Sequence, residues 1–254
     1  MFSVLDMFTI GVGPSSSHTV GPMVAAHAFA SSLQADHLVD RTARVKITLY
    51  GSLALTGLGH GTDRAAMAGL EGNLPATVDT DHMMHIREIC ALDDTLNLAG
   101  LKRIHFDYDR DVVFEQWKRM AAHPNGMRFQ AFDAAASLVD EQVWYSIGGG
   151  FVRKGAPEDP MIGIHERPPE GASFADADES SSTDFGVEAP YPFSSCTELV
   201  SLCREHHLSI AELVWANETA SRSGIQVRSD IDACYARLCG PRMHLGGTHI
   251  ARWP

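Results

Sequence analysis

The chain has 254 residues, of which 44% are hydrophobic and 20% charged, proportions that are typical of a globular protein. Its net charge of −12 disfavours nucleic acid and anionic membrane surfaces as partners. No stretch has the length and apolarity of a transmembrane helix, and the first residues do not form a secretory signal. The five cysteines lack the spacing of a disulfide framework, so we expect a cytoplasmic protein.

Residues 1–155 mix helical and strand patterns. The glycine-rich segment 51–61 predicts a sharp bend, and 107–111 predicts a turn between two strands. This mixture favours an α+β fold, a mixed sheet-and-helix sandwich, over a doubly wound sheet. Hydrophobic periodicity predicts helices at 19–34, 62–70 and 79–92, and strands at 45–49, 104–106, 112–114, 127–134 and 142–147.

The rest of the chain divides into two further zones. Residues 156–189 are acidic and rich in proline and serine, which is typical of a linker. Residues 190–254 favour a short all-helical segment, with two helices that begin at Ser195 and Ser209 and a third over 230–238. Each of those serines precedes a glutamate by three residues, as in a capping box.

The segment from Gly13 to Pro22 joins four hydroxyl side chains and His18 at the entry to a predicted helix. Such an entry attracts anions, because its backbone N–H groups lack partners within the helix. Histidine adds a group that titrates near neutral pH. The segment therefore predicts a site for a small carboxylate, and the alternative is a well-capped helix with a surface histidine.

Three further segments place chemistry-bearing residues at the ends of predicted elements. His60 lies between Gly59 and Gly61, His123 opens a turn with Asn125, and three glycines follow Ile147. Each segment alone fits a purely structural turn, but together they place three histidines where sites commonly form.

Several other chemistries lack their sequence signals. The histidines do not show the close spacing of a helical zinc motif, and Ser16 lacks the G-x-S-x-G elbow of a serine hydrolase. Gly13 does not begin a Walker loop. The cysteines contain no C-x-x-C pair, so we expect no metal ligands among them, and four of them fit a buried helix face: Cys196, Cys203, Cys234 and Cys239.

Four segments resemble the bacterial iron–sulfur L-serine dehydratases, or L-serine ammonia-lyases, in their sequence and in their order along the chain. They are GPSSSHTVGPM, YGSLALTGLGHGTD, HPNGMRF and YSIGGGF. The resemblance covers residues 2 to about 155 as that family's β domain. It continues to about residue 228 as the start of the helical catalytic α domain. The β domain is also similar to the allosteric substrate-binding domain of some phosphoglycerate dehydrogenases, so a non-catalytic serine- or carboxylate-binding module is the alternative.

The resemblance implies a lyase of amino acid catabolism and gluconeogenesis that converts L-serine to pyruvate and ammonia. It implies a [4Fe–4S] cluster, whose open iron acts as a Lewis acid on the serine hydroxyl. Carried over by motif, His18 and His60 are the catalytic candidates. The substrate-binding candidates are Ser15, Ser16, Ser17, Thr19, Gly59, Gly61, His123 and Asn125.

After about residue 229 the sequence departs from the family pattern, which indicates a truncated or frameshifted end. The cysteines that bind the cluster in this family lie deeper in the α domain, so the ligands are not identifiable in this chain. The resemblance therefore leaves two possibilities: a partner α chain that completes the enzyme, or an inactive remnant. It also implies a homodimer through the first domain.

Overall fold

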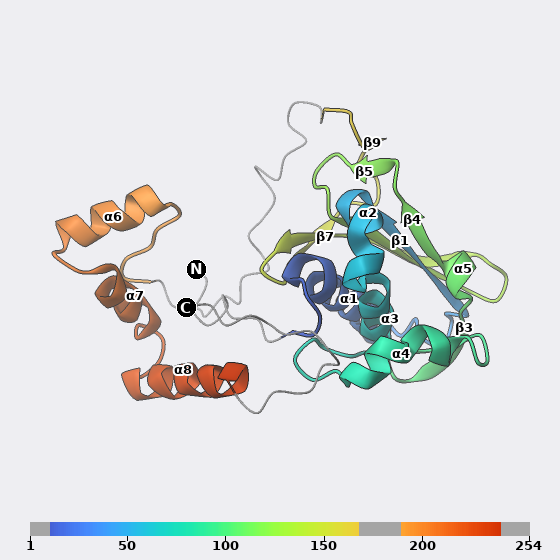
Figure 1. Cartoon of the computed structure of the whole chain (residues 1–254), viewed down its shortest axis with the longest axis horizontal. Coiled ribbons are helices and arrows are strands. Elements are labelled where there is room, and N and C mark those ends of the chain that lie inside the picture. The colour runs from blue at the N-terminus through green and yellow to red at the C-terminus, as the bar shows by residue number, and fades with distance from the viewer. Residues whose placement is uncertain (1–10, 168–188, 240–254) are drawn as a thin grey trace. The chain divides into compact units, whose positions relative to one another are not determined.

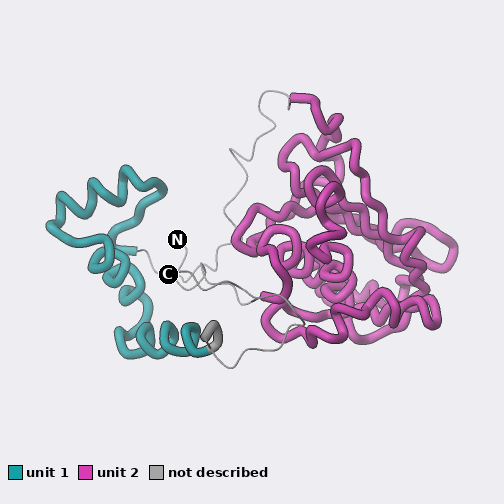
Figure 2. The backbone as a smooth tube through the Cα atoms, viewed as in Figure 1, with its two compact units in different colours: residues 1–10, 178–254 teal, residues 11–177 magenta. Residues whose placement is uncertain are grey.

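The structure is a computed structural model that describes residues 11–167 and 189–239 (Figure 1). The chain divides into two compact units, residues 11–177 and residues 178–254 together with 1–10 (Figure 2). We call residues 11–167 the α/β unit and residues 189–239 the helical segment. No helix among these described residues has the length and apolarity needed to cross a membrane.

The α/β unit contains a π-helical turn, five α-helices and nine strands. The helical elements are η2 (Ser16–Val20), α1 (Gly21–Ala35), α2 (Gly51–His60), α3 (Thr62–Leu70), α4 (Thr80–Cys90) and α5 (Tyr108–Asp111). The strands are β1 (Arg44–Tyr50), β2 (Thr95–Leu98), β3 (Lys102–His105), β4 (Val112–Glu115), β5 (Lys118–Met120), β6 (Gly126–Phe132), β7 (Leu138–Gly148), β8 (Phe151–Gly155) and β9 (Met161–Gly163).

The sheet is mixed, which confirms the predicted α+β class. Its order is β2-β3-β1-β6-β7-β8, with β4 also paired to β1. Strands β3 and β4 both run parallel to β1, whereas β6, β7 and β8 follow as an antiparallel meander. The predicted strands near 104 and 112 therefore do not pair across a turn, because the short helix α5 carries the chain from one to the other along β1.

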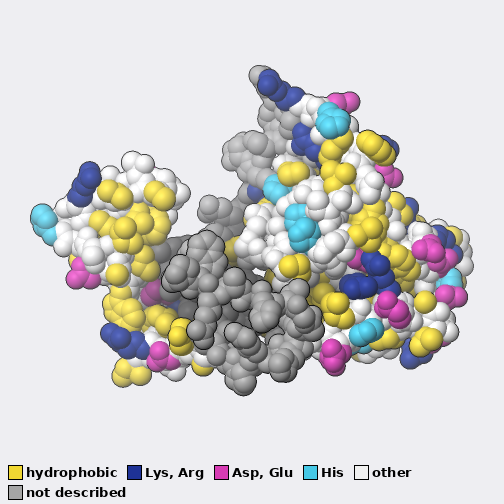
Figure 3. Space-filling view, viewed as in Figure 1, with side chains coloured by type: hydrophobic (Ala, Val, Ile, Leu, Met, Phe, Trp, Pro, Cys, Tyr) yellow, Lys and Arg dark blue, Asp and Glu magenta, His cyan; other side chains and the backbone are white. Residues whose placement is uncertain are grey.

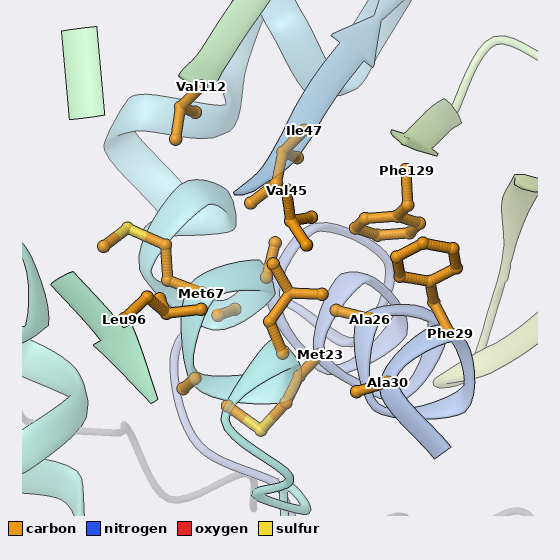
Figure 4. Packing of buried hydrophobic residues seen from close by; sticks show 14 of the residues in the cluster. Met23, Ala26, Phe29, Ala30, Val45, Ile47, Met67, Leu96, Val112 and Phe129 are labelled. Atoms are coloured by element: carbon orange, nitrogen blue, oxygen red, sulfur yellow. The ribbon is translucent and has the colours of Figure 1, made fainter. Parts of the chain in front are cut away.

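The core lies between the sheet and helices α1 and α3. Apolar residues of α1 recur at helical spacing and are fully buried, and Phe29 stacks on Phe129 of β6 at 5.4 Å between ring centroids (Figure 4). Helix α3 approaches α1 closely at Gly69, where an added Cβ would lie 2.3 Å from the Met23 carbonyl oxygen. This packing holds the amino end of α1 against the sheet.

The predicted sharp bend over residues 51–61 is wrong, because Gly51–His60 form helix α2. Gly51 and Gly61 have positive φ angles and bound the helix, while Gly57 continues it. Leu53, Ala54 and Gly57 are buried on one side. Burial of that side offsets the weak helix propensity of glycine, which costs about 1 kcal/mol per residue.

The helical segment contains α6 (Cys196–Glu205), α7 (Ile210–Glu218) and α8 (Gly224–Cys239). Both predicted N-caps are confirmed, because the Ser195 hydroxyl accepts from the Glu198 N–H and Ser209 forms a complete capping box with Glu212. The box at Ser195 is not complete, since the Glu198 carboxylate accepts from the Ser194 N–H instead. Helix α8 begins earlier than predicted, at Gly224. Hydrophobic side chains gather on the visible surface of this segment (Figure 3).

The expected linker is described only in part. Residues 161–163 within it form β9, which pairs with β5. Residues 168–188 of that linker, and the end of the chain after residue 239, lie outside the described residues.

Candidate functional site

The end of β1 brings three distant segments to one edge of the sheet. Because β6 runs antiparallel to β1, the turn before β6 lies beside this end, with Leu49 opposite Met127. The last residues of β7 lie there as well, since Tyr145 pairs with Gly126. Gly51 makes the approach possible, because its φ is +53° and an added Cβ would lie 2.4 Å from the Pro124 carbonyl oxygen.

The hydroxyl-rich segment enters α1 through the π-helical turn η2. The Ser15 hydroxyl caps this turn by accepting from the His18 N–H at 3.1 Å. The Ser15 carbonyl accepts from the Val20 N–H at 3.2 Å, five residues ahead. Such π turns are rare in proteins overall, but many of those that occur lie at functional sites. Here the wider turn presents the Ser17 and His18 side chains at the sheet edge.

The imidazole of His18 is held at both ring nitrogens. Its Nδ1 lies 2.9 Å from the Ser17 hydroxyl, and its Nε2 lies 3.0 Å from the hydroxyl of Ser52 at the start of α2. Each serine hydroxyl can donate or accept, so the pair accommodates either neutral tautomer. The result is a fixed ring plane.

His60 is the last residue of α2, and its ring faces that of His18. The two ring centroids are 5.0 Å apart, with the rings tilted by 42°. The His60 Nδ1 lies 2.9 Å from the Thr56 carbonyl oxygen, which can only accept. Nδ1 therefore carries the proton in the neutral ring, and Nε2 has no hydrogen-bond partner among the described residues.

Burial shifts two of the three histidines toward the neutral form. Burial is the main cause that lowers the pKa of His18, the charge of His60 lowers it further, and a hydrogen bond to Ser52 acts in the opposite direction. Burial alone lowers the pKa of His123. At neutral pH both rings are therefore uncharged, and the hydroxyl and N–H groups remain to attract an anion.

Asn125 connects the turn before β6 to the histidine pair. Its side-chain amide donates to the Ser146 carbonyl at 3.1 Å, and the Ser146 hydroxyl donates to the Ser17 carbonyl at 2.7 Å. His123 is connected to the pair through Asn125, because its Nδ1 accepts from the Asn125 N–H at 3.1 Å. His123 thus supports the site through Asn125, while His18 and His60 contact each other directly.

The other predicted residues occupy different positions around the pair. Ser16 is exposed, and an added Cβ at either Gly59 or Gly61 would meet no atom within 4 Å, so the surface beside His60 is open. Thr19, in contrast, is fully buried and donates its hydroxyl to the His60 carbonyl at 2.8 Å.

Sequence reasoning missed Ser52, Thr62 and Ser146. Ser52 binds the His18 ring, Thr62 donates to the His18 carbonyl at 2.6 Å, and Ser146 donates to the Ser17 carbonyl. Ser146 alone carried a usable signal, because a serine among the apolar residues of a buried strand requires a partner. The partners of Ser52 and Thr62 are 34 and 44 residues away in sequence, so no local pattern indicates them.

The described residues do not assemble a metal site. No three of their histidine, cysteine, aspartate or glutamate side chains group closely enough to hold an ion. Cys90 is buried, and burial raises the pKa of its thiol to about 12, so it remains protonated and is a poor ligand. The described cysteines therefore do not fit an iron–sulfur cluster.

The fold and this site define a class of protein: an α+β domain that gathers serine hydroxyls and two facing imidazoles at one sheet edge. A family model described as the serine dehydratase beta chain matches residues 3–156. The chain therefore belongs to the serine dehydratase family.

Individual relatives agree with this assignment. The chain is 41% identical to an L-serine dehydratase of Streptomyces coelicolor over 229 residues, which are 90% of this chain and 46% of the relative. It is 40% identical to L-serine dehydratase 2 of Escherichia coli over 224 residues, which are 88% of this chain and 44% of the relative. An L-serine dehydratase of Helicobacter pylori is 37% identical over 222 residues, 87% of this chain and 44% of that protein. The chain thus spans about half the length of these relatives.

Proposed function

We propose that this chain serves an L-serine ammonia-lyase, which converts L-serine to pyruvate and ammonia, and that its α/β unit holds the substrate. The observation that carries the proposal is the pair of facing imidazoles, 5.0 Å apart, at a sheet edge lined with serine hydroxyls. The relatives named L-serine dehydratase supply the reaction and the substrate.

The proposal assigns a task to each part of the chain. Residues 1–155 are the substrate-facing domain, 156–189 a linker, and 190–254 the beginning of a helical catalytic domain. A partner α chain would complete the enzyme, and we also propose a homodimer through residues 1–155. The compartment we propose is the cytoplasm, because the cysteines described by the structure are free thiols.

The hydroxyl groups are suited to the substrate carboxylate. Ser15, Ser16 and Ser17 lie at the entry to α1, and the first two are half-buried and exposed respectively. Hydroxyls and the dipole of the long helix that follows both favour negative charge. Because the neighbouring imidazole of His18 is neutral at neutral pH, these groups hold the carboxylate without a formal positive charge.

His60 is suited to proton transfer. Its Nδ1 proton is committed to the Thr56 carbonyl, so the Nε2 lone pair faces the site as a base. In the dehydration, a base removes the α-proton and the β-hydroxyl leaves as water, which gives aminoacrylate. Aminoacrylate tautomerises and hydrolyses to pyruvate and ammonia. His18, held at both ring nitrogens, is suited to orienting the substrate beside this base.

An iron–sulfur cluster is the family's means of activating the hydroxyl. The described cysteines do not fit such a cluster, so we route no step through it and assign to this chain only binding, orientation and proton transfer.

The test has two arms on the full 254-residue chain. Anaerobic reconstitution with iron and sulfide, followed by assay of pyruvate and ammonia from L-serine, tests the reaction. Isothermal titration with L-serine tests the site. Where the reconstituted chain turns over L-serine, we expect His60→Gln to abolish turnover. We expect His18→Gln to weaken L-serine binding by about tenfold, the loss of one or two hydrogen bonds. His85→Gln is the matched control, because His85 is exposed and makes the same ring-to-carbonyl bond four residues back, to Asp81.

The outcomes separate the two functions that the family allows. Binding without turnover supports the substrate-holding role of the α/β unit, either as a domain that a partner α chain completes or as a serine-binding module. Absence of both binding and turnover, in a chain that folds, contradicts the proposed site.

A further inference from the structure

Two threonines join the histidine segments through reciprocal hydrogen bonds. Thr19 follows His18 and donates its hydroxyl to the carbonyl of His60 at 2.8 Å. Thr62 follows His60 by two residues and donates its hydroxyl to the carbonyl of His18 at 2.6 Å. Each histidine thus accepts, at its own backbone, a bond from the threonine that follows the other. We call these two threonines and the two carbonyls they bind the threonine clasp.

Packing fixes the clasp in this arrangement. Both threonines are fully buried, and each lies against a glycine. An added Cβ at Gly13 would lie 2.6 Å from the Thr19 methyl carbon, and an added Cβ at Gly57 would lie 3.0 Å from the Thr62 hydroxyl oxygen. Threonine has few χ1 rotamers, and a side chain at either glycine would displace the neighbouring threonine. Among the described residues, each hydroxyl makes one hydrogen bond, to the carbonyl of the opposite histidine.

The carbonyls that the clasp binds belong to the same residues whose imidazoles form the site. The two hydrogen bonds link the backbones of His18 and His60, so the remaining freedom of each ring is in its side-chain torsions. Ser17 and Ser52 hold one ring, and Thr56 holds the other. We propose that Thr19 and Thr62 are positioning residues that set the spacing of the two imidazoles from outside the substrate pocket. The inference rests on the proposed function only where it concerns L-serine.

Matched substitutions isolate the hydroxyls. Thr19→Val and Thr62→Val keep the branched shape and remove the donor, whereas Thr19→Ser and Thr62→Ser keep the donor. Thr42→Val is the control, because Thr42 is also fully buried and donates to a carbonyl, that of Leu38 at 2.9 Å. It should lose comparable stability without any contact to the histidine pair.

Nuclear magnetic resonance of the histidine rings supplies a readout that does not depend on activity. In the unmodified chain, nuclear Overhauser effects should connect the two rings, whose centroids are 5.0 Å apart. In the valine variants we expect weaker effects between the rings. We also expect the pKa of His18 to rise toward its ordinary value of 6.5, because the ring becomes less buried and the electrostatic interaction with His60, which also lowers the pKa, weakens. The serine variants should restore both signals, and Thr42→Val should leave both unchanged.

Binding provides the second readout. In each valine variant we expect the dissociation constant for L-serine to rise about fivefold, the equivalent of one hydrogen bond of ordinary net strength. Ring signals that stay unchanged in folded valine variants overturn the proposal, and so does an equal response in Thr42→Val. If the valine variants do not fold, the unmodified chain decides: slowly exchanging hydroxyl protons at Thr19 and Thr62 support the clasp, and their absence overturns it.

The two proposals fail separately. If the ring signals respond as expected but the chain does not bind L-serine, the clasp stands and the proposed function fails. If L-serine binds and the valine variants bind it equally well with unchanged rings, the function stands and the clasp fails.

Discussion

The α/β unit and the helical segment differ in how much apolar surface their own residues bury. In the α/β unit, α1 alone buries eight of its residues, among them Phe29 and Leu33. In the helical segment α6 buries none, and Leu213 and Val227 are the buried hydrophobic residues of the described part. Ile225 of α8 is 84% exposed. Both regions have regular helices, so local signals suffice to form helices but not to build a core.

The difference predicts that the two regions respond unequally to cavities. Phe29→Ala should lower the free energy of unfolding of the α/β unit by about 4 kcal/mol, because it removes a buried ring stacked on Phe129. Hydrogen exchange measured by mass spectrometry should show faster exchange in β1 and unchanged exchange in α7. Val200→Ala on the exposed side of α6 should change stability by less than about 0.5 kcal/mol. Equal losses from both substitutions would contradict the comparison.

A second prediction concerns a buried ion pair within the α/β unit. Asp63 is fully buried and pairs with Arg87, and it also accepts from the Tyr108 hydroxyl at 2.9 Å. Asp63→Ala should cost about 3 kcal/mol in urea unfolding, because Arg87 loses its counter-charge. Asp93→Ala breaks the exposed pair with Arg103 and should cost less than about 1 kcal/mol. A smaller loss at Asp63 than at Asp93 would mean that burial does not control this interaction.

The helical segment should depend more on its caps. Ser209→Ala removes the capping box of α7 and should destabilise that helix by about 1 kcal/mol, visible as a loss of helical Cα chemical shifts over residues 210–218. Ser201→Ala, at an exposed position inside α6, should preserve or slightly raise helicity because alanine is the better helix former. An unchanged α7 in the first variant would show that packing, not the cap, defines that helix.

The smallest expected effect is a pH dependence confined to the α/β unit. His18 and His123 have pKa values below 6.5 in the folded chain and near 6.5 in the unfolded chain. Their contribution to stability is therefore complete above pH 6.5 and is lost as the pH falls through the folded values, since the unfolded chain binds protons first. Urea unfolding at several pH values should show this decline. The double substitution of both histidines by glutamine should flatten it, and an unchanged slope would contradict the assignment.

Local signals in the sequence determined much of the fold. The alternation of Val45, Ile47 and Leu49 predicted β1, and the serine–glutamate spacing predicted the starts of α6 and α7. Glycine misled the prediction at 51–61, because burial of one side of α2 outweighs a weak local preference. The pairing of both β3 and β4 with β1 was equally invisible, since strand order depends on contacts between distant residues.

The site divides in the same way. Residue types and spacing singled out His18 and His60 as candidates, because titratable groups beside glycines and hydroxyls are visible in a linear sequence. Only the tertiary structure decided that their rings face each other, that Ser52 and Ser146 hold the surrounding segment, and that Thr19 gives its hydroxyl to a backbone carbonyl. The physical reason is directional: a hydrogen bond requires its two atoms within about 3 Å. Only the packing of α1, α2 and the end of β7 on one sheet edge supplies those distances.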